Sequence, residues 1–113
     1  MRETVKVCLY GNGGGHQVWK AYNISGVEVV GIAGVDENAM PESVRGKAPH
    51  YDSLEEMVLS SGADIVSICA PVRKGQAQLS VWCMEQGKHV YAEKPSAFTE
   101  KELDEIIAAS KRT

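Results

Sequence analysis

The sequence predicts an α/β fold, a doubly wound parallel sheet with helices on both faces, in a single domain. Three observations support this prediction. Short apolar segments typical of strands alternate with segments of helical periodicity along the 113 residues. The connections between them are short, which favours parallel strands joined by right-handed crossovers. The first apolar segment ends in four glycines within five residues, which is typical of a tight turn from a strand into a helix.

The first half of the chain supplies two clear strands. Thr4–Tyr10 is short and rich in β-branched residues, as expected for a strand. His16–Ile24 has the pattern of a helix. It precedes Val27–Ala33, an almost continuously apolar run expected for a strand that is covered on both faces. The proline and glycine residues of 34–49 predict irregular structure, with a short additional strand near Tyr51.

The second half of the chain alternates helices and strands. Periodicity and capping residues predict helices over Leu54–Ser60 and Lys74–Gln86, a last helix that begins after Thr99, and strands over Asp64–Ala70 and Lys88–Ala92. Ser53 and Thr99 are each followed three residues later by a glutamate, which is the spacing of a capping box. In the Lys74–Gln86 helix, we expect Ala77, Val81 and Met84 to share the inner stripe.

Composition and charge argue against nucleic-acid and membrane functions. The chain is 43% hydrophobic and 24% charged, with a formal net charge of −3, which is ordinary for a globular domain. It has neither a Lys/Arg run for nucleic acid nor an apolar run of membrane-spanning length. The N-terminus leads directly into a strand without a signal-peptide core, so we expect a cytoplasmic protein. Cys8, Cys69 and Cys83 are odd in number and lie in apolar runs, which predicts reduced core thiols and no disulfide or metal site.

The glycine-rich segment after the first strand fits a dinucleotide-binding loop. Glycines permit a tight turn and the close approach of a pyrophosphate, which the N-terminus of the following helix binds. A strand before the loop and a helix after it are the context of a Rossmann-type fold. Counted from Gly11, G-x-G-x-x-G has a histidine at its third position. Either Gly15 serves in a shifted register, or the His16 ring faces the phosphates or the solvent. The candidate residues are Gly11, Asn12, Gly13, Gly14, Gly15 and His16.

An acidic residue after the second strand binds the adenosine ribose in this type of fold. The position directly after that strand holds Gly34, and Asp36 follows two residues later. Asp36 could reach the ribose or cap the turn that follows it. No arginine adjoins Asp36 to pair with a 2′-phosphate, although Arg45 and Lys47 could fold back towards it. We therefore expect NAD or NADP as the cofactor, with NAD preferred.

The segment Gly87–Pro95, GKHVYAEKP, places two charged residues at the end of the last predicted strand. In an open α/β sheet the carboxyl ends of the strands face the ligand, so Glu93 and Lys94 are candidate site residues. A lysine beside a nicotinamide could polarise a carbonyl or transfer a proton. A surface ion pair at the end of the strand is the alternative interpretation.

These motifs resemble the N-terminal domain of the Gfo/Idh/MocA family, the group of glucose–fructose oxidoreductase and inositol dehydrogenase. The resemblance runs from about Val5 to Lys111. Three segments show the resemblance: VCLYGNGGGH, SLEEMV with ADIVSICAP, and MEQGKHVYAEKPSAFT. The last of them is close to the family pattern G-K-H-V-x-x-E-K-P. The resemblance implies a Rossmann domain that binds NAD or NADP.

The resemblance also implies roles for individual residues. Lys94 would lie near the nicotinamide and the substrate and take part in catalysis. Glu93 would lie near the nicotinamide ribose, and the loop Ala70–Pro71–Val72 would border the cofactor. In the complete enzymes, hydride would pass between a sugar-like or polyol substrate and the nicotinamide.

Two departures from the family pattern bear on function. Family members often carry a histidine in a T-P-x-x-x-H pattern, and here that position holds Gly75. They continue with a second α/β domain that supplies substrate contacts, a catalytic histidine and most of the oligomer interface. We expect residues 1–113 to form the NAD(P)-binding domain without this substrate domain, because the chain stops at Thr113, about where the second domain would begin.

Three functions therefore stay open. The chain is the cofactor-binding domain of an oxidoreductase that is inactive without a substrate domain, a non-catalytic NAD(P)-binding sensor or regulatory module, or an interaction domain with an unused pocket. Without a second domain, apolar surface around Trp82, Phe98 or Ile107 should be exposed. We therefore expect a homo-oligomer, most simply a two-fold dimer, with no nucleic-acid or membrane partner.

Overall fold

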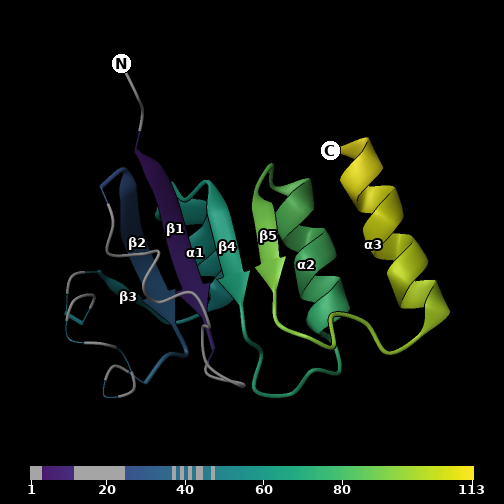
Figure 1. Ribbon diagram of the computed structural model, residues 1–113, viewed down its shortest axis with the longest axis horizontal. Coiled ribbons are helices and arrows are strands. Elements are labelled where there is room, and N and C mark those ends of the chain that lie inside the picture. Colours follow the sequence, from purple (N-terminus) through teal and green to yellow (C-terminus); the bar gives the residue numbers. More distant parts are fainter. Residues whose placement is uncertain are drawn as a thin grey trace.

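The computed structural model describes residues 4–11, 25–36, 38, 40, 42, 45, 46 and 48–113. These residues form a five-stranded parallel sheet in the order β3-β2-β1-β4-β5 (Figure 1). The strands are β1 (Val5–Tyr10), β2 (Val27–Ala33), β3 (His50–Tyr51), β4 (Ile65–Ile68) and β5 (His89–Ala92). The helices are α1 (Leu54–Ser60), α2 (Gln76–Glu85) and α3 (Glu100–Arg112). Among the described residues, the predicted alternation of strands and helices from residue 50 onward and the short strand at Tyr51 are confirmed.

The strand order reverses at β1, which is the first strand in sequence and the middle one in space. β2 and β3 follow on one side of it, and β4 and β5 follow on the other. A doubly wound sheet of this kind has its switch point between the two strands at the reversal, here β1 and β4. Ligands bind outside the carboxyl ends of the strands at such a point. The topology therefore places the candidate ligand site at the carboxyl edge of the sheet.

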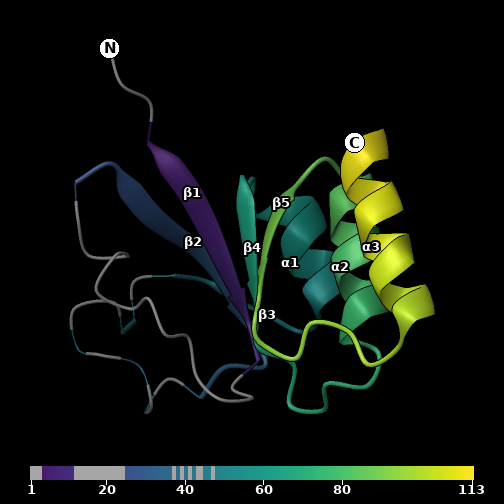
Figure 2. The ribbon, with the colours of Figure 1, turned by 45° about the vertical axis from the view of Figure 1, so that its right-hand side comes forward.

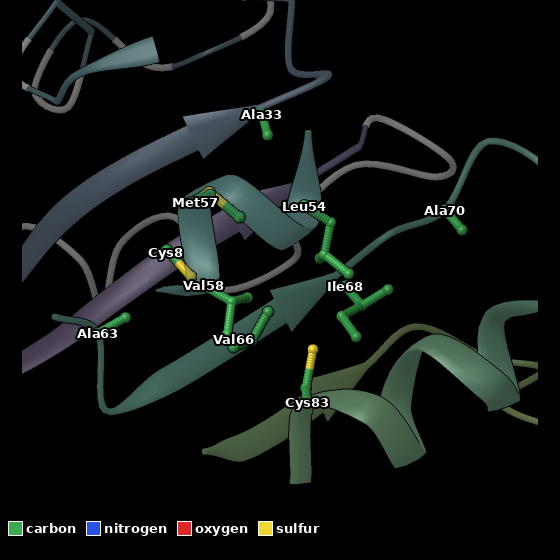
Figure 3. Close-up of a cluster of buried hydrophobic side chains, with 10 residues drawn as sticks. All are labelled: Cys8, Ala33, Leu54, Met57, Val58, Ala63, Val66, Ile68, Ala70 and Cys83. Atoms are coloured by element: carbon green, nitrogen blue, oxygen red, sulfur yellow. The ribbon is translucent and has the colours of Figure 1, made fainter. Parts of the chain in front are cut away.

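The two faces of the sheet carry separate apolar cores because successive side chains of a strand point to opposite faces. On one face Cys8 joins a buried cluster with residues of α1 and α2. Figure 3 shows the cluster: Cys8, Ala33, Leu54, Met57, Val58, Ala63, Val66, Ile68, Ala70 and Cys83. On the other face Val7 and Leu9 pack with Ile32 and Met40. The described helices lie on one side of the sheet (Figure 2). The helix predicted over His16–Ile24 lies outside the described residues.

The predicted capping residues begin α1 and α3. Ser53 Oγ accepts a hydrogen bond from the Glu56 N–H at 3.1 Å at the start of α1. Thr99 and Glu102 form a full capping box at the start of α3, since each side chain accepts a hydrogen bond from the backbone N–H of the other residue. Of these two described helices, only α3 has the reciprocal bond of the box. The starts of these two helices could be predicted because capping is a local interaction.

The inner face of α2 differs from the predicted stripe. Its buried residues are Gln76, Ala77, Ser80 and Cys83, while Val81 and Met84 are half-buried. Two of the buried residues are polar, and periodicity of apolar residues could not find them. Ser80 Oγ donates to the Gln76 backbone carbonyl at 3.1 Å, which satisfies the hydroxyl within the helix.

Helix α3 packs against α2 and buries little of its own apolar surface. Ala109 is its buried residue, while Leu103 and Ile107 are 47% and 44% exposed. Phe98, just before the helix, is 58% exposed. The exposure predicted for Phe98 and Ile107 is confirmed. The exposure predicted for Trp82 is not found, because Trp82 is half-buried against the core cluster that contains Cys8. Within the described part of the chain, none of the helices has the length and apolar character needed to cross a membrane.

Candidate functional site

The carboxyl edge of the sheet brings together all of the described residues that the sequence predicts for the site. Gly11 follows β1, Gly34 and Asp36 follow β2, Ala70 and Pro71 follow β4, and Glu93 and Lys94 follow β5. The parallel strands place all of these positions at the same edge. The other predicted residues, Asn12, Gly13, Gly14, Gly15 and His16, lie outside the described residues.

Gly11 lies against Cys69 and Pro71, which follow β4, and no side chain would fit at this position. Its φ is +77°, in the left-handed region, and a Cβ built on it would collide with the Cys69 carbonyl oxygen and lie 3.2 Å from Pro71 Cδ. Its N–H donates to the Ala33 carbonyl at 3.0 Å, and the Cys69 N–H donates to the Tyr10 carbonyl at 2.8 Å. Gly11 is buried, and the absence of a side chain lets the end of β1 pack closely against the chain after β4 at the switch point. In dinucleotide-binding loops the first glycine has this role of permitting the tight turn out of the strand. This fits a dinucleotide.

Gly34 explains why the acidic residue is displaced from the end of β2. Its φ is +63°, a conformation that a side chain would strain. A Cβ at Gly34 would lie 3.7 Å from Tyr10 Cε1 and 3.9 Å from Gly11 Cα, so the ends of β1 and β2 adjoin. The first carboxylate beyond this turn is that of Asp36, which is exposed.

Asp36 caps the turn that follows it, one of the two roles that the sequence allows. Its Oδ1 accepts a hydrogen bond from the Asn38 N–H at 3.0 Å. Arg45 folds back onto the same loop, since Nη2 donates to the Met40 carbonyl at 2.8 Å and to the Asn38 carbonyl at 3.4 Å. A carboxylate and a guanidinium are therefore both attached to the loop after β2. Lys47 lies outside the described residues.

The ends of β4 and β5 bring Glu93 and Lys94 to the edge beside Ala70 and Pro71. The last backbone bond between the two strands runs from the Glu93 N–H to the Ile68 carbonyl at 2.8 Å. The Lys94 N–H then donates to Glu93 Oε1 at 2.9 Å, which fixes the carboxylate against its own backbone. The Lys94–Pro95 peptide bond is cis, and Lys94 is exposed. Among the described residues, no hydrogen bond or ion pair holds the Lys94 ammonium.

Two side chains that the sequence analysis missed join these two strand ends. Gln76 is fully buried, its Oε1 accepts from the Ala70 N–H at 2.9 Å, and its Nε2 donates to the Glu93 carbonyl at 2.6 Å. Arg73 donates through Nη1 to the Ala70 carbonyl and through Nε to the Lys94 carbonyl at 3.3 Å. We call Gln76, Arg73 and their four backbone partners the side-chain clamp. The sequence held one signal for Gln76. It directly follows Gly75, which stands at the position where family members often carry a histidine.

The three cysteines are buried free thiols, as predicted. Burial raises the pKa of Cys8 to about 11 and that of Cys83 to about 12. Cys69, at the carboxyl edge, also has a raised pKa, because it is buried and because the Glu93 carboxylate opposes a thiolate. A neutral thiol is a poor nucleophile, so Cys69 does not present a reactive group to a ligand. No cluster of potential metal ligands occurs among the residues that the structure describes.

The sequence matches the family described as "Oxidoreductase family, NAD-binding Rossmann fold" (GFO_IDH_MocA) over residues 5–113. The chain belongs to this family. A scyllo-inositol 2-dehydrogenase (NADP(+)) of Bacillus subtilis is 40% identical to it over 78 residues, which are 66% of this chain and 23% of that protein. A glycosyl hydrolase family 109 protein of Shewanella pealeana is 30% identical over 125 aligned positions, which cover 98% of this chain and 27% of that protein.

Solved structures of dehydrogenases share the fold. The WlbA dehydrogenase of Chromobacterium violaceum, in complex with NADH and UDP-GlcNAcA, superposes with a TM-score of 0.78 at 26% identity, over 99% of this chain and 33% of that one. The myo-inositol 2-dehydrogenase of Lactobacillus plantarum superposes with a TM-score of 0.74 at 21% identity, over 97% of this chain and 34% of that one. The chain thus spans about a quarter to a third of the length of the relatives that it matches. It corresponds to their NAD(P)-binding Rossmann domain.

Proposed function

We propose that the chain binds NAD(H) or NADP(H) across the carboxyl edge of the sheet and serves a hydride-transfer enzyme as its cofactor domain. The observation that carries the proposal is the bare backbone of Gly11 at the switch point between β1 and β4. A side chain is excluded there by the Cys69 carbonyl, and a glycine at the end of the first strand is what a pyrophosphate-binding loop requires. Family membership supports the same cofactor class.

The residues that would hold the cofactor divide along the edge. The glycine-rich loop from Gly11 to His16 would hold the pyrophosphate, and Asp36 would accept hydrogen bonds from the adenosine ribose. Ala70, Pro71 and Glu93 would border the nicotinamide half, as the family resemblance implies. The bound nicotinamide would supply the hydride acceptor or donor.

Lys94 would act on the substrate as the catalytic residue. Its ammonium is exposed at the end of β5, and no described residue holds it by a hydrogen bond or ion pair. As the ammonium, it could donate a hydrogen bond or a proton to a substrate carbonyl oxygen on reduction. As the neutral amine, it could accept the proton that a substrate hydroxyl loses on oxidation. The hydrogen bond from Arg73 Nε to the Lys94 carbonyl would fix the backbone from which the Lys94 side chain extends.

NAD is the proposed preference, because Asp36 would repel a 2′-phosphate. Arg45 is the residue that could oppose this preference. Its guanidinium lies on the same loop, but it already donates to two backbone carbonyls. Titration calorimetry with NADH and NADPH tests both the function and the preference. Absence of binding by either cofactor to the folded chain would refute the proposed function.

The proposed substrate class is a sugar-like or polyol hydroxyl compound. The relatives named for inositol and the structure with UDP-GlcNAcA support this class. Because the chain spans a quarter to a third of these proteins, substrate contacts would come from a second domain. The alternative is a non-catalytic NAD(P)-binding sensor or regulatory module. The Gly75 departure favours this alternative.

A chimaera distinguishes the two functions. Residues 1–113 would replace the matching segment of the Bacillus subtilis scyllo-inositol dehydrogenase. We expect measurable oxidation of inositol and a loss of about 100-fold or more in kcat for Lys94→Ala, within the range for a proton-transferring group. Lys74→Ala, an exposed lysine on the preceding loop, is the control. A folded, cofactor-binding chimaera without activity would favour the sensor.

We also propose that this chain by itself forms a two-fold dimer through α3. Phe98, Leu103 and Ile107 expose apolar surface along one flank of the molecule, and a self-complementary patch favours a second copy. Light scattering at increasing concentration should detect the dimer, and Leu103→Ser with Ile107→Ser should return it to monomer. Replacement of Leu59, which is 65% exposed on α1, is the control. A wild-type monomer throughout would contradict the proposal.

A further inference from the structure

The Gln76 side chain continues the pairing of β4 and β5 beyond the point where their backbones part. The two strands pair through Ile68 and Ala92, and the last backbone bond joins Glu93 N–H to the Ile68 carbonyl. Beyond it, the Ala70 N–H and the Glu93 carbonyl are both bonded to the Gln76 amide. A side-chain amide has one acceptor oxygen and two N–H donors, so it can bridge a backbone donor and a backbone acceptor.

Burial makes this bridge specific to glutamine. The Gln76 side chain is 0% exposed, and a buried polar group that loses its partner loses the bond without regaining water. Its own backbone is also fixed, because the N–H donates to the Arg73 carbonyl at 2.9 Å and the carbonyl accepts from Ser80 Oγ at 3.1 Å. The start of α2 is therefore a rigid support from which the amide reaches the two strand ends.

Arg73 adds a second, outer connection between the same two loops. Its guanidinium donates to the carbonyls of Ala70 and Lys94. Four backbone groups of the two loops are thereby held by two side chains of one short segment. The loop Ala70–Pro71 and the pair Glu93–Lys94 cannot separate or shift in register without breaking these bonds.

We propose that Gln76, assisted by Arg73, is a positioning residue that sets the separation of the Ala70–Pro71 loop from Glu93–Lys94. This inference rests on the proposed function, in which these loops border the nicotinamide half of the cofactor. Because Gln76 is fully buried, its side chain would contact neither cofactor nor substrate. It acts through the backbone of the two loops that would border the nicotinamide. Removal of its amide should therefore weaken binding of the nicotinamide half of the cofactor and leave binding of the adenosine half unchanged.

The test compares two ligands that share the adenosine half. Affinities of NADH and of ADP-ribose, which lacks the nicotinamide, are measured by calorimetry for wild type, Gln76→Leu and Gln78→Leu. Gln78 is the matched control, because it lies on the same helix and is exposed, with its Nε2 donating to Glu102 Oε2 at 3.2 Å. We expect Gln76→Leu to weaken NADH binding about tenfold and ADP-ribose binding less than twofold, and Gln78→Leu to change neither.

Equal losses for both ligands, or no loss for either, would overturn the proposal, because a general structural defect does not distinguish the two halves of the cofactor. Arg73→Ala keeps the inference testable if Gln76→Leu does not fold, since Arg73 is half-buried and its removal leaves the core intact. It should show the same NADH-specific loss with a smaller amplitude, and an equal effect on both ligands would count against the clamp.

Amide hydrogen exchange separates this inference from the proposed function. The Ala70 N–H should exchange at least tenfold faster in Gln76→Leu than in wild type, while the Cys69 N–H, bonded to the Tyr10 carbonyl, should keep its protection. If wild type binds neither ligand, the proposed cofactor function fails. Unchanged Ala70 exchange in Gln76→Leu would instead show that the clamp does not hold the loop, whatever the ligand results.

Discussion

The two halves of the carboxyl edge are built on opposite principles. At the ends of β1 and β2, Gly11 and Gly34 have positive φ angles, and the edge depends on the absence of side chains. At the ends of β4 and β5, the edge depends on the buried amide of Gln76 and the guanidinium of Arg73. One half lets strand ends pack closely with no side chain between them, and the other ties backbone in place with side chains. The difference matches the proposed ligand, because a pyrophosphate needs close access and a reacting ring needs fixed neighbours.

The largest expected effect breaks the glycine half. Gly11→Ala should lower the free energy of unfolding by about 4 kcal/mol or prevent folding, because the new Cβ combines a positive φ with a collision against the Cys69 carbonyl. Gly62→Ala is the control, since Gly62 has a φ of +73° and nothing within 4 Å of an added Cβ. Backbone strain alone should cost it about 1–2 kcal/mol. Urea denaturation that gives equal losses would show that the close approach to β4 is not needed.

The next effect breaks the clamped half. Gln76→Leu should lower the free energy of unfolding by about 3 kcal/mol, because it leaves the Ala70 N–H and the Glu93 carbonyl without their buried partner. Gln78→Leu should change it by less than about 0.5 kcal/mol, as is usual for a surface position. Urea denaturation of the two variants provides the comparison. If both substitutions proved neutral, the β4 and β5 ends would not rely on side chains.

A smaller effect sharpens the comparison by asking whether the glycine half also uses a charge. Asp36→Ala should weaken NADH binding about tenfold, through the loss of charged hydrogen bonds to the ribose, and should weaken NADPH binding less. Asp52→Ala, at an exposed aspartate before α1, should change neither affinity. Calorimetry measures all four values. If Asp36→Ala left the affinity for NADH unchanged, Asp36 would not bind the ribose, and its role would be the hydrogen bond that it accepts from the Asn38 N–H.

The smallest effect concerns pH at the outer end of the clamped half. Hydrogen bonds from the Phe98 N–H, then from Gln78 and the Thr99 N–H, hold the pKa of Glu102 below its usual value of 4.5. Because the folded-state pKa is the lower one, this stabilisation is present above pH 4.5 and is lost as the pH falls through the folded-state value. Glu102→Gln should therefore flatten the loss of thermal stability between pH 5 and 3 slightly. Glu105→Gln, on the same helix, is the control and should leave the pH dependence of thermal stability as in wild type. Equal pH dependence in the two variants would contradict the stabilising role of the Glu102 carboxylate.

The elements of the fold could be predicted because their causes are local. The apolar run Val27–Ala33 is a strand with these same bounds, and Leu54–Ser60 is a helix with the predicted cap at Ser53. The edge residues Gly11, Gly34, Glu93 and Lys94 could be predicted as well, because the order of strands and helices already fixes which strand ends face the same side. Asp36 stayed open between two roles, since the sequence does not show where a turn directs a carboxylate.

The sequence by itself determined the strands and the caps, since each depends on residues close together in the chain. The reason for a glycine at position 11 came from the tertiary structure, because the carbonyl that excludes a Cβ there belongs to Cys69. Only the tertiary structure decided the role of Gln76. A glutamine at the start of a helix has no visible partner in the sequence. Its partners, Ala70 and Glu93, lie on either side of it in the chain and meet only when β4 and β5 pair and then part. Burial and the separation of two strand ends, both long-range properties, made a polar residue part of the core.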